Sequence, residues 1–174
     1  MRPDLAGSAK PALSGWLGHK APFAFDQTYT PAPDIERMRV GTPPVLHLSA
    51  LEEALKVWDG VSMSEVREAS IGLCALFIEE VEARCPELTL ISPRGDAMRG
   101  SQVSFAFEHG YAAAQALIAR GVIGDFRAPN VIRFGFTPLY IDQVDVMAAV
   151  DVMEHVMNNQ LWDEPEYKTA HRVT

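Results

Sequence analysis

Apolar residues recur at regular spacing only after about residue 46, and this regular part of the chain predicts an alternation of helices and short strands. Over 62–84 the apolar positions return every three or four residues, which is typical of a helix with one buried face. Over 102–107 apolar and polar residues alternate, as in a half-buried strand. The predicted helices span 49–58, 62–84, 111–120 and 142–158, and the predicted strands span 88–91, 102–107, 122–126 and 131–136.

The same periodicity predicts which positions face the core. On strand 102–107 the side chains of Val103, Phe105 and Phe107 share one face. On the two longer helices the inward positions are Val66, Ala69, Leu73, Cys74, Phe77 and Val81, and then Val144, Met147, Ala148 and Val152. Two capping-box spacings, from Ser49 and from Ser62, predict where the first two helices begin.

The order of these elements is helix-helix-β-β-α-β-β-α, which predicts the fold class. We expect an α/β (α+β) small domain, with a small mixed or antiparallel sheet and helices on one side. Residues 1–45 have no helical periodicity and hold more than half of the twelve prolines. Irregular segments of this length usually serve a site. We therefore expect this segment to pack on a surface that the chain does not itself provide.

Composition and charge exclude several classes of function. The share of hydrophobic residues is 48% and that of charged residues 22%, as in ordinary globular proteins. The net charge of -8 argues against nucleic acid and anionic membranes as partners. The two cysteines, Cys74 and Cys85, lack the spacing of metal ligands, so no metal site is predicted. No hydrophobic signal segment or membrane span is evident, and a cytoplasmic location is predicted.

Arg133 is the candidate binding residue in the most informative stretch, 127–140. It interrupts an apolar strand, between Ile132 and Phe134. A guanidinium group cannot remain unpaired in an apolar layer, so it must reach solvent, a carboxylate of the protein or an anionic ligand. Arginine is well shaped to bind a ligand carboxylate through two parallel hydrogen bonds. An arginine on the solvent face or in an internal ion pair is the alternative.

Two residues of the N-terminal segment are candidates for holding a phosphate. Trp16 lies in a Gly-Trp-x-Gly-His turn, and its indole offers a flat apolar face with one N–H donor. Thr42 follows Gly41, and its hydroxyl and the neighbouring backbone N–H could hold a phosphate. The structural alternatives are a tryptophan that pins a loop to a core and a threonine that stabilises a turn.

Several motifs, in this order along the chain, resemble the kynureninase family of pyridoxal-phosphate (PLP) enzymes. They are Gly-Trp-Leu-Gly-His at 15–19, Arg-Val-Gly-Thr-Pro-Pro at 39–44, Arg-Gly-Ser-Gln at 99–102 and the Arg-x-Pro-Asn-x-Ile-Arg block with its Pro-Leu-Tyr at 127–140. The resemblance implies an aminotransferase-like fold. It assigns 1–45 to the end of the large PLP-binding domain and 46–174 to the C-terminal small domain.

The resemblance also implies a reaction and roles for three residues. Kynureninases hydrolyse L-kynurenine to anthranilate and L-alanine in tryptophan catabolism, with PLP as cofactor, and they act as homodimers. By resemblance, Trp16 and Thr42 would contact the PLP phosphate from the neighbouring subunit of the dimer. Arg133 would bind the α-carboxylate of L-kynurenine.

The chain departs from the family in one important respect. The lysine that binds PLP covalently in the family would precede residue 1, and none of the lysines present has the family's sequence context. No catalytic residue is therefore predicted in this chain, and we expect it to be inactive without the missing N-terminal portion. The alternative is a non-catalytic module derived from a PLP enzyme, which dimerises or binds a small carboxylate.

Overall fold

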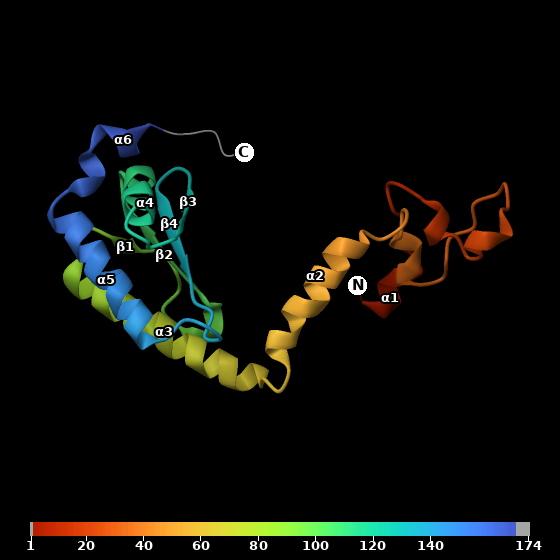
Figure 1. Ribbon diagram of the computed structural model, residues 1–174, viewed down its shortest axis with the longest axis horizontal. Coiled ribbons are helices and arrows are strands. Elements are labelled where there is room, and N and C mark those ends of the chain that lie inside the picture. The colour runs from red at the N-terminus through yellow and green to blue at the C-terminus, as the bar shows by residue number, and fades with distance from the viewer. Residues whose placement is uncertain (1, 170–174) are drawn as a thin grey trace. The chain divides into compact units, whose positions relative to one another are not determined.

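The computed structural model describes residues 2–169 of the chain (Figure 1). These form two compact units, Met1–Asp59 and Gly60–Thr174, which we describe separately. The second unit holds the regular secondary structure that the sequence predicts. The first is irregular apart from one longer helix. The predicted domain boundary after residue 45 concerns the family's domains and stays a prediction.

The second unit contains a four-stranded antiparallel sheet in the order β1-β2-β4-β3. Its strands are β1 (Thr89–Leu90), β2 (Gln102–Ala106), β3 (Asp125–Arg127) and β4 (Val131–Gly135). Its helices are α3 (Met63–Arg84), α4 (Gly110–Ile118), α5 (Gln143–Asn158) and the short α6 (Pro165–Lys168), with the 3-10 turns η5 (Asp96–Met98) and η6 (Leu161–Asp163). The predicted order of elements and the α/β class are confirmed.

The core lies between one face of this sheet and the helices, and α3 and α5 run side by side along it (Figure 1). Burial alternates along β2 and β4, because successive side chains of a strand point to opposite faces. At the centre, Phe77 of α3 packs against the rings of Phe105, Phe134 and Phe136, with centroid separations of 6.0, 5.1 and 5.0 Å. Both Cys74 and Cys85 are fully buried here.

The buried face of α5 differs from the predicted one. Val144 and Ala148 are exposed, whereas the residues that reach the core are Val146, Val150, Met153, Val156 and Met157. This helix carries apolar residues on more than one side, so spacing alone does not determine its orientation. A capping box sets its start: the Asp142 carboxylate accepts hydrogen bonds from the N–H groups of Val144 (2.7 Å) and Asp145 (3.1 Å).

Neither predicted capping box forms, and of the two predicted helix starts the one at Ser62 is confirmed. The Ser62 hydroxyl precedes α3 but pairs with the Ser64 hydroxyl at 2.7 Å, and it caps no backbone N–H. The first predicted helix begins earlier than Ser49, because Pro44 already stands at the N-cap position of α2 (Val45–Leu55).

The third strand also starts later than predicted, at Asp125. Gly124 lies so close to β4 that a Cβ atom there would be 2.8 Å from the Arg133 carbonyl oxygen. Residues 122–124 therefore lead into β3 without being part of it, and the pairing of β3 with β4 begins at Asp125.

The first unit has almost no apolar core. It contains α1 (Pro3–Ala6), α2 and the 3-10 turns η1 (Trp16–Gly18), η2 (Pro22–Ala24), η3 (Ile35–Met38) and η4 (Lys56–Trp58). Its most buried large side chain is Arg37, whose guanidinium donates to the carbonyl oxygens of Ala32 (2.8 Å), Gly7 (2.5 Å) and Ala9 (3.1 Å). No residue of α2 is buried. Hydrogen bonds to the backbone therefore hold this unit in place of apolar packing.

Candidate functional site

Arg133 lies in the middle of the sheet, on the face opposite the core. In β4 it stands directly between Ser104 of β2 and Asp125 of β3. Its Nε donates a hydrogen bond to Asp125 Oδ1 at 2.5 Å, and its Nη2 donates to Asp125 Oδ2. The Arg133 side chain is 29% exposed and that of Asp125 46%. Of the partners that the sequence leaves open, the structure therefore shows a carboxylate of the protein.

The strand alternation explains this placement. Ile132 and Phe134 are buried against the helices, so the side chain between them must point to the other face. Asp125 was not predicted as part of the site. The signal that could have found it is an acidic residue on the adjacent strand, but using that signal requires the register between β3 and β4.

Arg133, Asp125 and a second arginine, Arg127, together carry a net positive charge. Hydrogen bonding from Arg133 lowers the pKa of Asp125 below its usual range, and the nearby charge of Arg127 acts in the same direction. Arg127 Nη2 lies 3.2 Å from Asp125 Oδ2. These two cations and one anion together carry one net positive charge, although the chain as a whole carries -8. Such a surface attracts a carboxylate.

Arg133 has both small and larger neighbours on its face of the sheet. Residues paired across an antiparallel sheet share a face, so this face carries Ser104, Ala106 and Gly135 and also Gln102 and Val131. A Cβ atom added at Gly135 would meet no other atom within 4 Å. The sheet surface directly over Gly135 therefore has free space, and Gln102 stands beside it.

Trp16 and Thr42, the predicted phosphate contacts, both lie in the first unit. Trp16 begins the turn η1, is 48% exposed and meets the ring of Phe23 edge-on at 5.5 Å. Gly15 fits against Val40 so closely that a Cβ atom there would lie 1.6 Å from the Val40 carbonyl oxygen. The absence of a side chain at Gly15 thus brings the tryptophan turn onto the segment that leads into Thr42.

The donors of these two residues fit a phosphate. Within residues 2–169, no protein acceptor pairs with the Trp16 indole N–H or with the Thr42 hydroxyl, and Thr42 is exposed. A Cβ atom at Gly41 would meet nothing within 4 Å, so the backbone beside Thr42 is also open. Trp16 lines a cavity of about 390 Å³ together with seven other residues of its unit. Arg133 belongs to the other unit.

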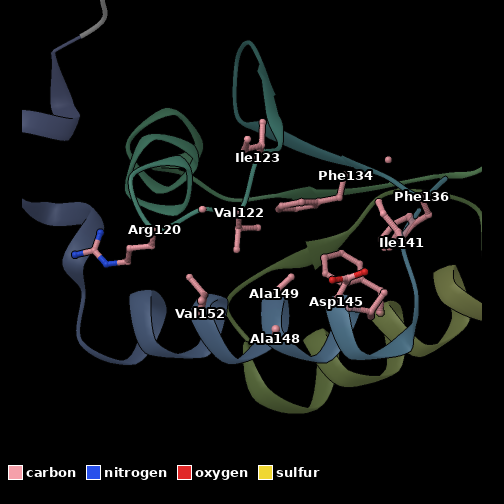
Figure 2. Close-up of a pocket in the computed structure, with 14 residues that line it drawn as sticks. Arg120, Val122, Ile123, Phe134, Phe136, Ile141, Asp145, Ala148, Ala149 and Val152 are labelled. Atoms are coloured by element: carbon pink, nitrogen blue, oxygen red, sulfur yellow. The ribbon is translucent and has the colours of Figure 1, made fainter. Parts of the chain in front are cut away.

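A further cavity, of about 340 Å³, lies between the sheet and α5 in the second unit. Figure 2 shows Phe134, Phe136 and Ile141 on one side of it and Ala149 and Val152 of α5 on the other. Its lining is mainly apolar and includes none of the predicted site residues. In the part of the chain that the structure describes, no helix could cross a membrane, and no three His, Cys, Asp or Glu side chains are grouped to hold a metal ion.

Comparison with known proteins gives consistent matches. Residues 66–153 match the kynureninase C-terminal domain family. The chain is 46% identical to kynureninase of Burkholderia mallei over 93% of its length, and 44% identical to kynureninase of Pseudomonas fluorescens over 99%. It covers 39% and 42% of those relatives, so it spans about two-fifths of their length.

Solved structures of similar fold come from more distant proteins. The apo cysteine desulfurase of Thermococcus onnurineus matches with a TM-score of 0.73 and 18% identity, over 91% of this chain and 42% of the other. The K223A variant of C-DES, with glycine covalently linked to its PLP cofactor, matches with a TM-score of 0.67 and 18% identity, over 87% of this chain and 39% of the other. At such identities the likeness shows the fold alone, which is that of the aminotransferase-like PLP enzymes.

Proposed function

This chain belongs to the kynureninase family, and we propose that it supplies the C-terminal part of an enzyme that cleaves L-kynurenine to anthranilate and L-alanine. The reaction requires the N-terminal portion that the longer relatives possess. The observation that carries this proposal is the high identity to kynureninases along almost the whole chain, combined with an arginine on an open, net positive sheet face.

Arg133 binds the α-carboxylate of the substrate in this proposal. Three features support the role: the guanidinium is partly exposed, its directly paired neighbour on β2 is the small residue Ser104, and Arg133, Asp125 and Arg127 together carry one net positive charge. A carboxylate held by arginine is fixed in orientation as well as in position. Binding at Arg133 therefore orients the rest of the amino acid for the reaction.

Trp16 and Thr42 contact the phosphate of PLP, at the site of the neighbouring subunit in a homodimer. Their unpaired donors and the open backbone at Gly41 support this assignment. PLP, when bound, supplies an electron sink for cleavage of the bond between Cβ and Cγ of kynurenine. A cytoplasmic location agrees with the composition and completes the proposal.

The chain alone is inactive in this proposal, because no lysine in it is suited to bind PLP covalently. Lys10, Lys20, Lys56 and Lys168 are all exposed. Two of them are in ion pairs, Lys56 with Glu53 at 2.6 Å and Lys168 with Asp163 at 2.7 Å. Reactive lysines are activated by desolvation or by a neighbouring cation. Exposure excludes desolvation for all four, and the group paired with Lys56 or Lys168 is an anion.

A second candidate is a module that dimerises without catalysis. The apolar side chains on α2 favour it, since Leu46, Leu51 and Leu55 are all exposed. An apolar helix surface of this kind marks an interface. The same surface is equally expected if the N-terminal portion of an intact enzyme covers it, so activity must decide between the two.

The test is to fuse this chain to the N-terminal three-fifths of the Pseudomonas fluorescens enzyme and to measure anthranilate release from L-kynurenine. We expect turnover by the fusion and none by the chain alone, with bound PLP visible by absorbance only in the fusion. A fusion that binds PLP but releases no anthranilate would favour the non-catalytic module. Turnover by the chain alone would contradict the assignment of the cofactor lysine to the missing portion.

A further inference from the structure

Asp125 occupies one specific edge of the Arg133 guanidinium group. The two hydrogen bonds run from Nε and Nη2 to the two carboxylate oxygens, so the carboxylate lies against the side edge of the planar fork. Within the described residues, Nη1 has no protein partner. The end edge, formed by Nη1 and the second N–H of Nη2, therefore remains available to a second carboxylate.

The sheet holds Asp125 in this place. Asp125 and Arg133 are directly paired in the register of β3 and β4, and the close approach at Gly124 brings the strands together at that point. Arg127 holds the same carboxylate from the other side, at 3.2 Å. An arginine side chain is long and flexible, so a fixed carboxylate on one edge removes much of its rotational freedom before any ligand binds.

We propose that Asp125 is a positioning residue: it holds the side edge of the Arg133 guanidinium so that the end edge faces the open sheet and receives the substrate carboxylate. This inference rests on the proposed function. It assigns the two edges of one guanidinium to two carboxylates, one of the protein and one of the substrate. Arg127 offsets the charge of Asp125, so the positive charge of Arg133 remains available to the ligand.

The opposite role would be competition, in which Asp125 occupies the place of the substrate carboxylate and must leave before binding. The two roles predict opposite effects on KM when the carboxylate is removed. If Asp125 positions Arg133, removal raises KM, because a mobile arginine must be ordered during binding. If Asp125 competes, removal lowers KM.

The experiment uses Asp125→Asn in the fusion enzyme, with Glu82→Gln as the matched control. Glu82 forms a comparable two-bond pair with Arg94 on the same unit, so its replacement removes the same charge and the same kind of contact. We expect Asp125→Asn to raise KM for L-kynurenine about tenfold with kcat changed less than about twofold, because a pre-ordered contact is lost from ground and transition states alike. Glu82→Gln should change neither constant by more than about twofold.

A second readout is independent of activity. In the 174-residue chain, the Arg133 Nε–H resonance should be resolved and slow to exchange with water, and Asp125→Asn should make it broaden or exchange fast. A lowered or unchanged KM in Asp125→Asn overturns the positioning role, and so does an Arg133 resonance that the substitution does not affect. Absence of turnover in the unsubstituted fusion overturns the proposed function and this inference with it.

Discussion

The two units of the chain differ in how much apolar surface they bury. In Gly60–Thr174, the helices and the sheet enclose a continuous apolar core in which Phe77, Phe105 and Val150 are almost fully buried. Among the described residues of Met1–Asp59, the buried ones are Ala6, Gly18, Ala32 and Arg37, and large apolar side chains such as Phe25 and Leu46 are exposed. A unit with such a core, Gly60–Thr174, can be stable by itself. The exposed apolar side chains of Met1–Asp59 are instead typical of a surface that another part of a protein covers.

The proposed substrate-binding residue and the proposed phosphate contacts lie in different units. Arg133 is held by a sheet that packs on its own core, so its geometry is already set within this chain. Trp16 lies on a turn held by backbone hydrogen bonds, and the close contact of Gly15 with Val40 brings that turn onto the segment that leads into Thr42. We therefore expect the substrate-binding residue to be ordered in the isolated chain, and the phosphate contacts to depend on the parts that complete the enzyme.

The largest expected effect comes from the centre of the second unit. Phe77→Ala removes a ring that packs against three others, and it should lower the free energy of unfolding by about 3–5 kcal/mol. The matched variant Phe23→Ala, at an exposed ring of the first unit, should change it by less than about 0.5 kcal/mol. Urea titrations followed by circular dichroism measure both, and equal losses would show that the first unit is packed as tightly as the second.

A pH series sharpens the same comparison, because both cysteines lie in the second unit. Burial raises the pKa of Cys85 to about 11 from its ordinary 9.0, and burial also raises the pKa of Cys74. Between pH 9 and 11 the Cys85 thiol ionises in the unfolded chain but stays protonated in the folded chain, so the stability present below pH 9 is lost as pH rises. We expect a loss of about 1.4 kcal/mol per pH unit from Cys85 in that window, and Cys74 acts in the same direction.

The control for the pH series is Cys85→Ala, measured at the same pH values. It should reduce the slope of unfolding free energy against pH by the share of one thiol. An unaltered slope would mean that Cys85 ionises as readily in the folded chain as in the unfolded one.

The smallest expected effect compares two aspartate caps. The Asp142 carboxylate caps the long helix α5, and Asp142→Ala should cost about 1 kcal/mol of unfolding free energy. The Asp34 carboxylate accepts from the Glu36 N–H at 2.9 Å in the short turn η3, and Asp34→Ala should cost only a few tenths of a kcal/mol. A larger loss at Asp34 would show that the turns of the first unit contribute more to stability than their lack of a core suggests.

The sequence predicts the parts of the fold that have a single clear period. The stripe through Leu73, Phe77 and Val81 identifies the buried face of α3, and the alternation of Val103 and Phe105 identifies that of β2. The buried face of α5 could not be predicted, because apolar residues occur on several sides of this helix. Its true inner face depends on contacts with α3, which are long-range in sequence.

In the candidate site, too, local periodicity predicts some features and long-range contacts determine the others. Alternation along β4 is enough to predict that Arg133 leaves the core and reaches solvent, a carboxylate of the protein or an anionic ligand. The choice of Asp125 depends on where β3 begins, and this start is set by the close approach of Gly124 to β4. Residue chemistry alone offers Trp16 and Thr42 as phosphate candidates beside structural alternatives, and the family resemblance favours the phosphate role, because a turn residue with an unpaired donor has no periodic signal.

The central claim is that Arg133 receives the substrate carboxylate, and the kinetics of Arg133→Ala in the fusion enzyme test it most directly. We expect kcat/KM for L-kynurenine to fall by an amount equivalent to about 2–4 kcal/mol, with a raised KM, because a charged binding partner is lost. Arg94→Ala, at an exposed arginine paired with Glu82, should leave kcat/KM within about twofold of the parent. A kcat/KM for Arg133→Ala equal to that of the parent would contradict the account.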